Sequence, residues 1–442
     1  MKRTIEKELI KWKNQVERYP LVVRGARQVG KSYLIENFGR ENFKNLVTVN
    51  FELQPGLKEC FTSLEPREIL NKLQMLLNTR IEEGNTLLFL DEIQECPKAI
   101  SSLRYFKEIM PRLAVIAAGS LLEFALRGAD FKMPVGRIHF LYLEPLSFAE
   151  FLEASGNSQL HQDLSNLALT DSVDDVIHDK LLDLVRHYMI LGGMPAVLNE
   201  YFRSGDLSNC QNIQNALIQT YRSDFGKYAS LAQHKYLLRV LEAAPRLVGQ
   251  RVKYVKIDHE ARSRDLKTAF ELLIMAGIIK TVYYSKASGL PLGAEINENK
   301  FRLNFLDVGL MQNICGLSAE FAVEKDLMQI NSGAVAEQFV GQELRACSDR
   351  HQPYQLFFWA RDKRGSMAEV DFVINVGSEI LPVEVKAGKA GRLKSMRLFI
   401  QEKKSRFGIR ISQGKLSYYD DILSVPLYMI EQLPRLVRGV ES

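Results

Sequence analysis

The chain has 442 residues, a length that favours about two to four domains over a single core. Its hydrophobic content of 46% and charged content of 25% are typical of a globular protein. No apolar run approaches the ~18 residues of a membrane span, and residues 1–15 predict an amphipathic helix rather than a secretory signal. The five scattered cysteines indicate a cytoplasmic protein without a disulfide framework or zinc site.

The first third of the chain shows the pattern of a parallel α/β domain. Short apolar runs recur with segments of helical length between them. Nearly continuous apolar strands are typical of a parallel sheet covered on both faces. We expect strands at 21–23, 46–51, 86–90, 113–118 and 138–143, a helix at 66–84, and a domain at 18–150 after an N-terminal helix at 1–17.

A glycine-bearing loop, GARQVGKS, follows the first predicted strand. Glycines let the backbone N–H groups of such a loop point at phosphate oxygens, and the following helix adds its positive N-terminal end. In this spacing Lys31 reaches the β and γ phosphates, and the Ser32 hydroxyl binds Mg²⁺. The alternative is a plain turn before an ordinary helix. The predicted nucleotide-contacting residues are Gly25, Ala26, Arg27, Gln28, Val29, Gly30, Lys31, Ser32 and Tyr33.

Polar residues follow the third and fourth predicted strands, where a parallel sheet binds its ligands. Asp91 is placed to hold Mg²⁺ through its water shell, and Glu92 is placed to polarise an attacking water. Ser120, after the fourth strand, could sense the γ-phosphate. Each of these residues also has a simpler interpretation, since acids and serines often cap the helix that follows a buried strand.

Together these motifs resemble an AAA+ ATPase, of the prokaryotic group often fused to a poorly characterised C-terminal module. The resemblance covers about residues 18–205, including YMILGGMPAVLNEY at 188–201. It implies ATP and Mg²⁺ as cofactors and nucleotide roles for Lys31, Ser32, Asp91, Glu92 and Ser120.

Two arginines compete for contact with the γ-phosphate. Arg137 matches the position of an arginine that could neutralise transition-state charge, and Arg127 is its competitor. A surface arginine without a catalytic role is an equal alternative for both. An arginine that acts across a subunit boundary would require a homo-oligomer. The lid arginine usual in the family is not readable in this sequence.

The middle third predicts a helical lid with a linker at 151–220 and a winged-helix-like domain at 221–325. The polar, acidic stretch 156–178 reads as an exposed insertion. A helix at 263–276, stopped by Gly277, precedes the apolar strand IIKTVYYS. A winged helix places a helix in the DNA major groove, and a protein–protein module of the same shape is the alternative.

The last third holds a group of acidic residues on two predicted strands, 369–375 and 380–386. Glu384 and Lys386 alternate on one strand face, and a hairpin would bring Asp371 beside them. A preceding helix presents Glu337 and Glu343. Carboxylates around one point can bind Mg²⁺ or Mn²⁺, and a metal with a lysine can activate water. The alternative is an ordinary hairpin with charged faces.

This pattern resembles the PD-(D/E)XK nuclease core over about residues 330–420, in a domain expected at 326–442. The resemblance implies metal ligation by Asp371, Glu384 and Glu343, with Lys386 assisting cleavage. Val370 stands where the motif has proline. Such folds also serve as binding platforms that do not cleave.

Positive charge is concentrated near the C-terminus. Residues 386–410 hold nine Lys or Arg and one acid, a local charge of +8, so the rest of the chain sums to −3. A phosphate-rich partner such as DNA would suit this segment, and its binding would weaken steeply with salt. The same charges could instead be the solvated face of a helix at 391–404.

The predicted protein is thus an α/β ATPase with a lid, a winged helix and a C-terminal α+β domain. Three function classes remain open: an ATP-dependent enzyme that cleaves DNA, a nucleotide switch that binds DNA or a protein without cutting, and a winged-helix regulator.

Overall fold

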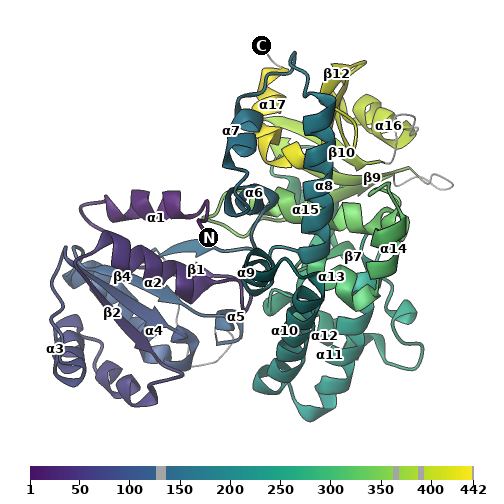
Figure 1. Cartoon of the computed structure of the whole chain (residues 1–442). Helices are drawn as coiled ribbons and strands as arrows, with labels where there is room; N and C mark the ends of the chain where they lie inside the picture. Colours follow the sequence, from purple (N-terminus) through teal and green to yellow (C-terminus); the bar gives the residue numbers. More distant parts are fainter. Residues whose placement is uncertain (126–135, 362–367, 387–392, 441–442) are drawn as a thin grey trace.

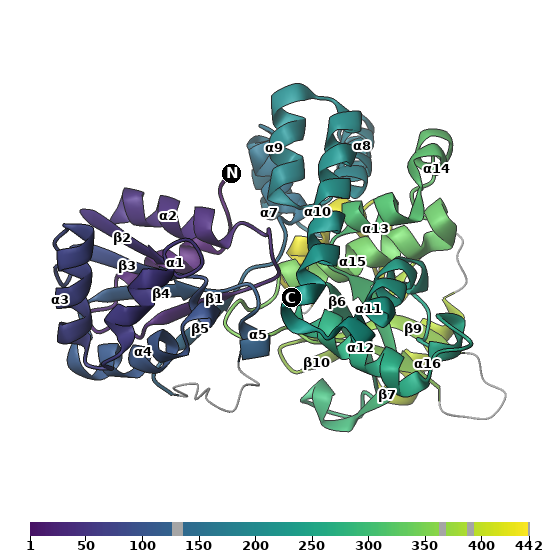
Figure 2. The ribbon, with the colours of Figure 1, turned by 90° about the horizontal axis from the view of Figure 1, so that it is seen from below.

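A computed structural model describes residues 1–125, 136–361, 368–386 and 393–440. The N-terminal α/β part lies beside a larger C-terminal half built on a second sheet (Figure 1). Seen from below, the two parts meet along the edge that carries β1, β5 and α5 (Figure 2). Among the described residues, no helix is long and apolar enough to cross a membrane.

The N-terminal sheet has five parallel strands in the order β2-β3-β4-β1-β5. Buried apolar residues fill both of its faces, as the continuous apolar runs predict. The elements are α1 (Glu6–Lys13), β1 (Leu21–Arg24), α2 (Lys31–Asn42), β2 (Asn45–Asn50), α3 (Pro66–Leu77), β3 (Thr86–Asp91), α4 (Pro97–Ile109), β4 (Ala114–Ala118), α5 (Leu122–Ala125) and β5 (His139–Tyr142). The five predicted strands and their parallel pairing are confirmed.

A run of helices follows the sheet. They are α6 (Phe148–Ala154), α7 (Ser158–Asn166), α8 (Asp175–Leu191), α9 (Pro195–Ser204) and α10 (Leu207–Tyr228). Most of the stretch 156–178, predicted as an exposed insertion or linker, is exposed, but it contains α7, whose His161 bonds to Glu431 at 2.7 Å and whose Leu164 is buried. A polar helix can dock through one apolar residue and one ion pair, which composition alone does not reveal.

The second sheet has eight strands in the order β12-β13-β11-β10-β9-β8-β6-β7. Its strands are β6 (Ile279–Ser285), β7 (Ile296–Phe305), β8 (Leu356–Ala360), β9 (Glu369–Val376), β10 (Glu379–Val385), β11 (Gly408–Ser412), β12 (Ser417–Tyr419) and β13 (Ile422–Pro426). The helices are α11 (Leu231–Ala243), α12 (Ser263–Met275), α13 (Val308–Cys315), α14 (Ser318–Val323), α15 (Ala334–Ala346), α16 (Lys394–Lys403) and α17 (Leu433–Gly439).

The strand IIKTVYYS, predicted to belong to a separate winged-helix-like domain, is β6 of this sheet. Strand β6 pairs with β7 on one side and, in parallel, with β8 on the other. The expected winged helix at 221–325 and the expected domain at 326–442 therefore share one sheet. Helix α10 also runs through the boundary expected at 220/221. Local helix–strand order cannot show such a pairing, because β6 and β8 lie about seventy residues apart.

Buried polar contacts join the two halves where the chain leaves the first sheet. The Gly193 N–H donates to Asp307 at 2.6 Å, and the Leu146 N–H donates to the Gly193 carbonyl at 2.8 Å. The Tyr188 hydroxyl donates to the Leu146 carbonyl and accepts from Gln342 of α15. A side chain at Gly192 would collide with Asp307, so the glycines of GGMP are required by this close packing.

Candidate functional site

The predicted phosphate loop joins β1 to α2 at the carboxyl end of the sheet. Gly30 has a left-handed backbone (φ 92°), which glycine adopts without strain. A Cβ at Gly25 would lie 2.2 Å from the Leu143 carbonyl oxygen, so only glycine fits there. The loop therefore has the geometry that lets its N–H groups face an anion at the start of α2.

Lys31 lies across this loop. Its ammonium donates to the carbonyls of Gly25 (3.0 Å) and Ala26 (2.8 Å), and the residue is 7% exposed. Burial lowers the pKa of Lys31 to about 8, while the nearby carboxylates of Glu92 and Asp91 oppose that shift. Of the other predicted loop residues, Val29 is packed in the core and Tyr33 is 61% exposed.

Ser32 and Asp91 meet at the end of β3. The Ser32 hydroxyl donates to Asp91 at 3.1 Å, and the Asn50 amide donates to the second Asp91 oxygen at 3.0 Å. Burial raises the pKa of Asp91 and the Ser32 bond opposes the rise. A hydroxyl beside a carboxylate is an oxygen donor pair of the kind Mg²⁺ prefers, so these residues fit the predicted ion.

Glu92 lies beside Asp91 with an unusual backbone, since φ is 48° in a residue that is not glycine. Its carboxylate accepts from Gln94 at 2.7 Å and from Ser120 at 3.2 Å. These two bonds fix the carboxylate at the strand ends of β3 and β4, which is the arrangement expected of a group that orients water. The structure thus brings together Lys31, Ser32, Asp91, Glu92 and Ser120.

Later segments of the chain contact the loop directly. Arg27 is bonded to Asp224 of α10 at 2.6 Å, and Tyr221 donates to the Arg27 carbonyl at 2.9 Å. At the N-terminus, Arg3 donates to the Val29 carbonyl at 3.2 Å. A Cβ on Gly277 would touch Ala26, which places the turn between α12 and β6 against the loop. The predicted phosphate loop is therefore in contact with the N-terminal segment and with the C-terminal half.

Arg137 is not near this site within one chain. It precedes β5, whereas the loop follows β1, and the two strands are parallel. Arg137 consequently lies at the opposite edge of the sheet, where it bonds to Glu108 of α4 at 3.1 Å. The prediction that it contacts the γ-phosphate is corrected for a single chain. The competing Arg127 lies outside the described residues.

The C-terminal carboxylates surround an arginine that the sequence did not single out. Arg302 of β7 is 7% exposed and pairs with Glu337 at 2.9 Å, Glu369 at 2.7 Å and Asp371 at 3.6 Å. The second Asp371 oxygen accepts from the Val385 N–H at 2.9 Å, so the predicted hairpin is confirmed. The guanidinium supplies the positive charge that this group of acids requires.

Glu384 and Lys386 lie at the edge of the same group. Glu384 is 2% exposed, one of its oxygens lies 3.7 Å from the Lys386 ammonium, and the other has no hydrogen-bond partner in the described structure. Burial raises the pKa of Glu384 to about 7, and Lys386 opposes the rise. Within the described ranges, no three His, Cys, Asp or Glu side chains are arranged to hold a metal ion.

Glu343 lies elsewhere. It is on α15, six residues beyond Glu337, and both of its oxygens accept from the Phe148 N–H at 3.1 Å. Its assignment as a metal ligand beside Asp371 and Glu384 is corrected: of the two acids on this helix, Glu337 reaches the cluster. Six residues along an α-helix leave two side chains about 120° apart around its axis, so the two acids face different neighbours.

A pH effect follows from this buried acid. Burial raises the pKa of Glu343 to about 8, above its value in the unfolded chain. Folding then binds a proton, so its contribution is present at low pH and is lost as pH rises from about 4.5 towards 8. The stability of Glu343→Gln relative to wild type should therefore be greater at pH 9 than at pH 5, by about 4 kcal/mol. Urea unfolding of both proteins at the two pH values measures this, and parallel pH profiles would contradict it.

Three regions of the chain match family models. Residues 17–152 match "AAA domain", residues 182–320 match "Domain of unknown function (DUF8612)", and residues 332–429 match "Domain of unknown function (DUF4143)". The last two models leave residues 321–331 between them, and the eight-stranded sheet has strands in both regions. A search of curated proteins finds no match.

Solved structures with some similarity include a Walker-type ATPase of Pyrococcus abyssi (17% identity, 70% of this chain, 95% of that chain, TM-score 0.46). Others are the RuvB Holliday junction branch migration motor of Thermotoga maritima (14%, 66% and 91%, TM-score 0.30) and AMPPCP-bound DnaA of Aquifex aeolicus (11%, 61% and 86%, TM-score 0.27). With TM-scores below 0.5, these likenesses add nothing to the argument on arrangement. Residues 17–152 thus match an AAA domain, and they are followed by two regions that match families without a described function.

Proposed function

We propose that this protein binds and hydrolyses ATP in its AAA domain and passes the nucleotide state to its C-terminal half, which binds a partner without cutting it. The observation that carries the proposal is the connected group at the strand ends. Lys31 lies over the loop, Ser32 contacts Asp91, and Ser120 contacts Glu92.

In this proposal each side chain has one role. Lys31 and the loop N–H groups bind the phosphates, and Glu92, held by Gln94 and Ser120, orients the attacking water. Ser32 and Asp91 would hold Mg²⁺, which when bound neutralises phosphate charge.

The contacts of the loop supply the route of coupling. Asp224 and Tyr221 of α10 bond to Arg27, and Gly277 lies against Ala26. A change in the loop on nucleotide binding must therefore move or strain the start of the C-terminal half. A phosphate-sensitive loop with such neighbours is suited to a switch.

DNA is the partner we propose for the C-terminal half, on the basis of the +8 charge of residues 386–410. Part of this charge is paired, since Arg397 bonds to Asp420 at 2.5 Å. Binding of a fluorescent duplex should fall steeply between 50 and 200 mM salt, and ATP turnover should rise when DNA is added. If a fraction of a protein extract raises ATP turnover and DNA does not, the partner of the C-terminal half is a protein and the DNA proposal is wrong.

Cleavage is the alternative that the carboxylate cluster raises, and the position of Arg302 argues against it. The guanidinium is paired with Glu337, Glu369 and Asp371, and it cannot activate water as a metal does. Purified protein with Mn²⁺ should nick supercoiled DNA no faster than its Asp371→Ala variant. Metal-dependent nicking that Asp371→Ala abolishes would establish a nuclease and refute this part of the proposal.

A further inference from the structure

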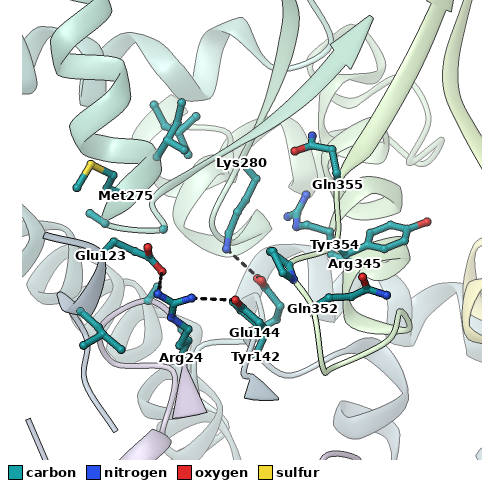
Figure 3. A pocket seen from close by; sticks show the side chains of 18 of the residues that line it. Arg24, Glu123, Tyr142, Glu144, Met275, Lys280, Arg345, Gln352, Tyr354 and Gln355 are labelled. Atoms are coloured by element: carbon teal, nitrogen blue, oxygen red, sulfur yellow. Dashed lines mark hydrogen bonds and ion pairs between the residues drawn. The ribbon is translucent and has the colours of Figure 1, made fainter. Parts of the chain in front are cut away.

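A cavity of about 380 Å³ lies between the two halves of the molecule (Figure 3). One wall comes from the AAA domain and includes Gly25 and Ala26 of the phosphate loop together with Ser120. The opposite wall comes from β6 and the end of α15 and includes Lys280 and Arg345. The cavity is thus continuous with the residues expected to surround the terminal phosphate of a nucleotide.

Arg345 is the unusual member of this lining. It is 4% exposed, and its Nη1 donates to the Asn304 side chain at 3.1 Å. Its Nε and Nη2 have no hydrogen-bond partner in the described part of the chain. Unused donors on a buried charged group are costly, and the two N–H groups of a guanidinium match a pair of oxygens on one anion.

Two ion pairs also line the cavity, and Arg350 is a further cation in its lining, with a hydrogen bond to the Thr4 hydroxyl at 3.3 Å. Arg24 bonds to Glu123 at 2.9 Å, and Lys280 bonds to Glu144 at 3.0 Å, as Figure 3 shows. Burial alone would raise the pKa of Glu144, but Lys280 and Arg345 hold it below its usual value. Glu144 therefore remains a negative group that competes with any anion for the positive charge of Lys280 and Arg345.

We propose that this cavity binds a phosphate oxyanion through the guanidinium of Arg345. Phosphate offers several oxygens to a guanidinium, and the cavity begins where hydrolysis would release phosphate. The choice of phosphate over another oxyanion rests on the proposed ATPase function. The phosphate is either the free ion or the phosphate group of a small molecule. Because Arg345 belongs to α15, binding of this phosphate would act directly on that helix.

Calorimetric titration with inorganic phosphate tests this inference on the full chain. The Lys31→Ala background is used, so that the phosphate loop does not contribute. Arg345→Met should weaken binding at least about tenfold. Glu144→Gln should strengthen it several-fold, because a competing carboxylate is removed. Arg203→Met, which changes an exposed arginine paired with Glu200 outside the cavity, should leave it unchanged.

Several results would overturn the inference. They are the absence of saturable phosphate binding, equal binding by Arg345→Met, or no gain from Glu144→Gln. If Arg345→Met fails to fold, the gain expected from Glu144→Gln decides alone. ADP and glucose 6-phosphate added to the same background separate nucleotide and sugar phosphates from the free ion. ATP binding by the wild type is measured separately, so a failure here is distinct from a failure of the proposed ATPase.

Discussion

Replacement of Lys31 by alanine should lower the affinity for ATP by at least about 100-fold, since a buried, charge-assisted contact to phosphate is lost. Lys31 lies 3.0 and 2.8 Å from two carbonyls of its own loop, so the ammonium is held where the phosphates would bind. Burial lowers the pKa of Lys31, and the nearby carboxylates of Glu92 and Asp91 oppose this by favouring its charged form. Titration with a fluorescent ATP analogue in Mg²⁺ measures the change.

The matched control is Lys44→Ala. Lys44 is an exposed lysine in the loop that precedes β2, and its backbone N–H donates to the Asn85 carbonyl. This variant should bind ATP as wild type does. Retention of full affinity by Lys31→Ala would show that the loop is a structural turn, the alternative that the sequence left open.

Replacement of Glu92 by glutamine should leave ATP binding intact and slow turnover by about 100-fold or more, the range expected when a general base is removed. Glu92 has a left-handed backbone and accepts from Gln94 and Ser120, so its carboxylate is held in one position. Glutamine keeps the size of the side chain and one acceptor oxygen, but it cannot polarise water. Single-turnover hydrolysis with a separate binding titration distinguishes the two steps.

Glu95→Gln serves as the control for this measurement. Glu95 is exposed, follows Glu92 in the same short turn and is paired with Lys58 at 3.4 Å. Its replacement should change neither binding nor turnover. If Glu92→Gln turns over ATP at the wild-type rate, Glu92 is a structural cap and another group must orient the water.

The sequence predicted the first sheet well because the information needed is local. Each strand is a short apolar run, and the polar residues that follow it mark the ligand-binding edge. Asn50 and Gln94 were not predicted, although both bond to the acids of the site. Asn50 ends β2 and could have been found by the rule that identified Ser120, namely a polar residue at the end of a buried strand.

The C-terminal half was predicted less completely because its defining contacts are distant in sequence. The hairpin of β9 and β10 was read from alternation, whereas the parallel pairing of β6 with β8 has no local signal. Nothing in the local sequence distinguishes Arg302 from other basic residues. Only the fold brings three acids, Glu337, Glu369 and Asp371, around it. The charge balance of a cluster therefore depends on topology, and a carboxylate motif alone did not reveal it.

Titration of the intact wild-type protein with ATP in the presence of Mg²⁺ tests the central claim most directly. The account predicts one saturable site per chain that ADP competes for and that Lys31→Ala removes. A folded protein with no measurable affinity for ATP would contradict it.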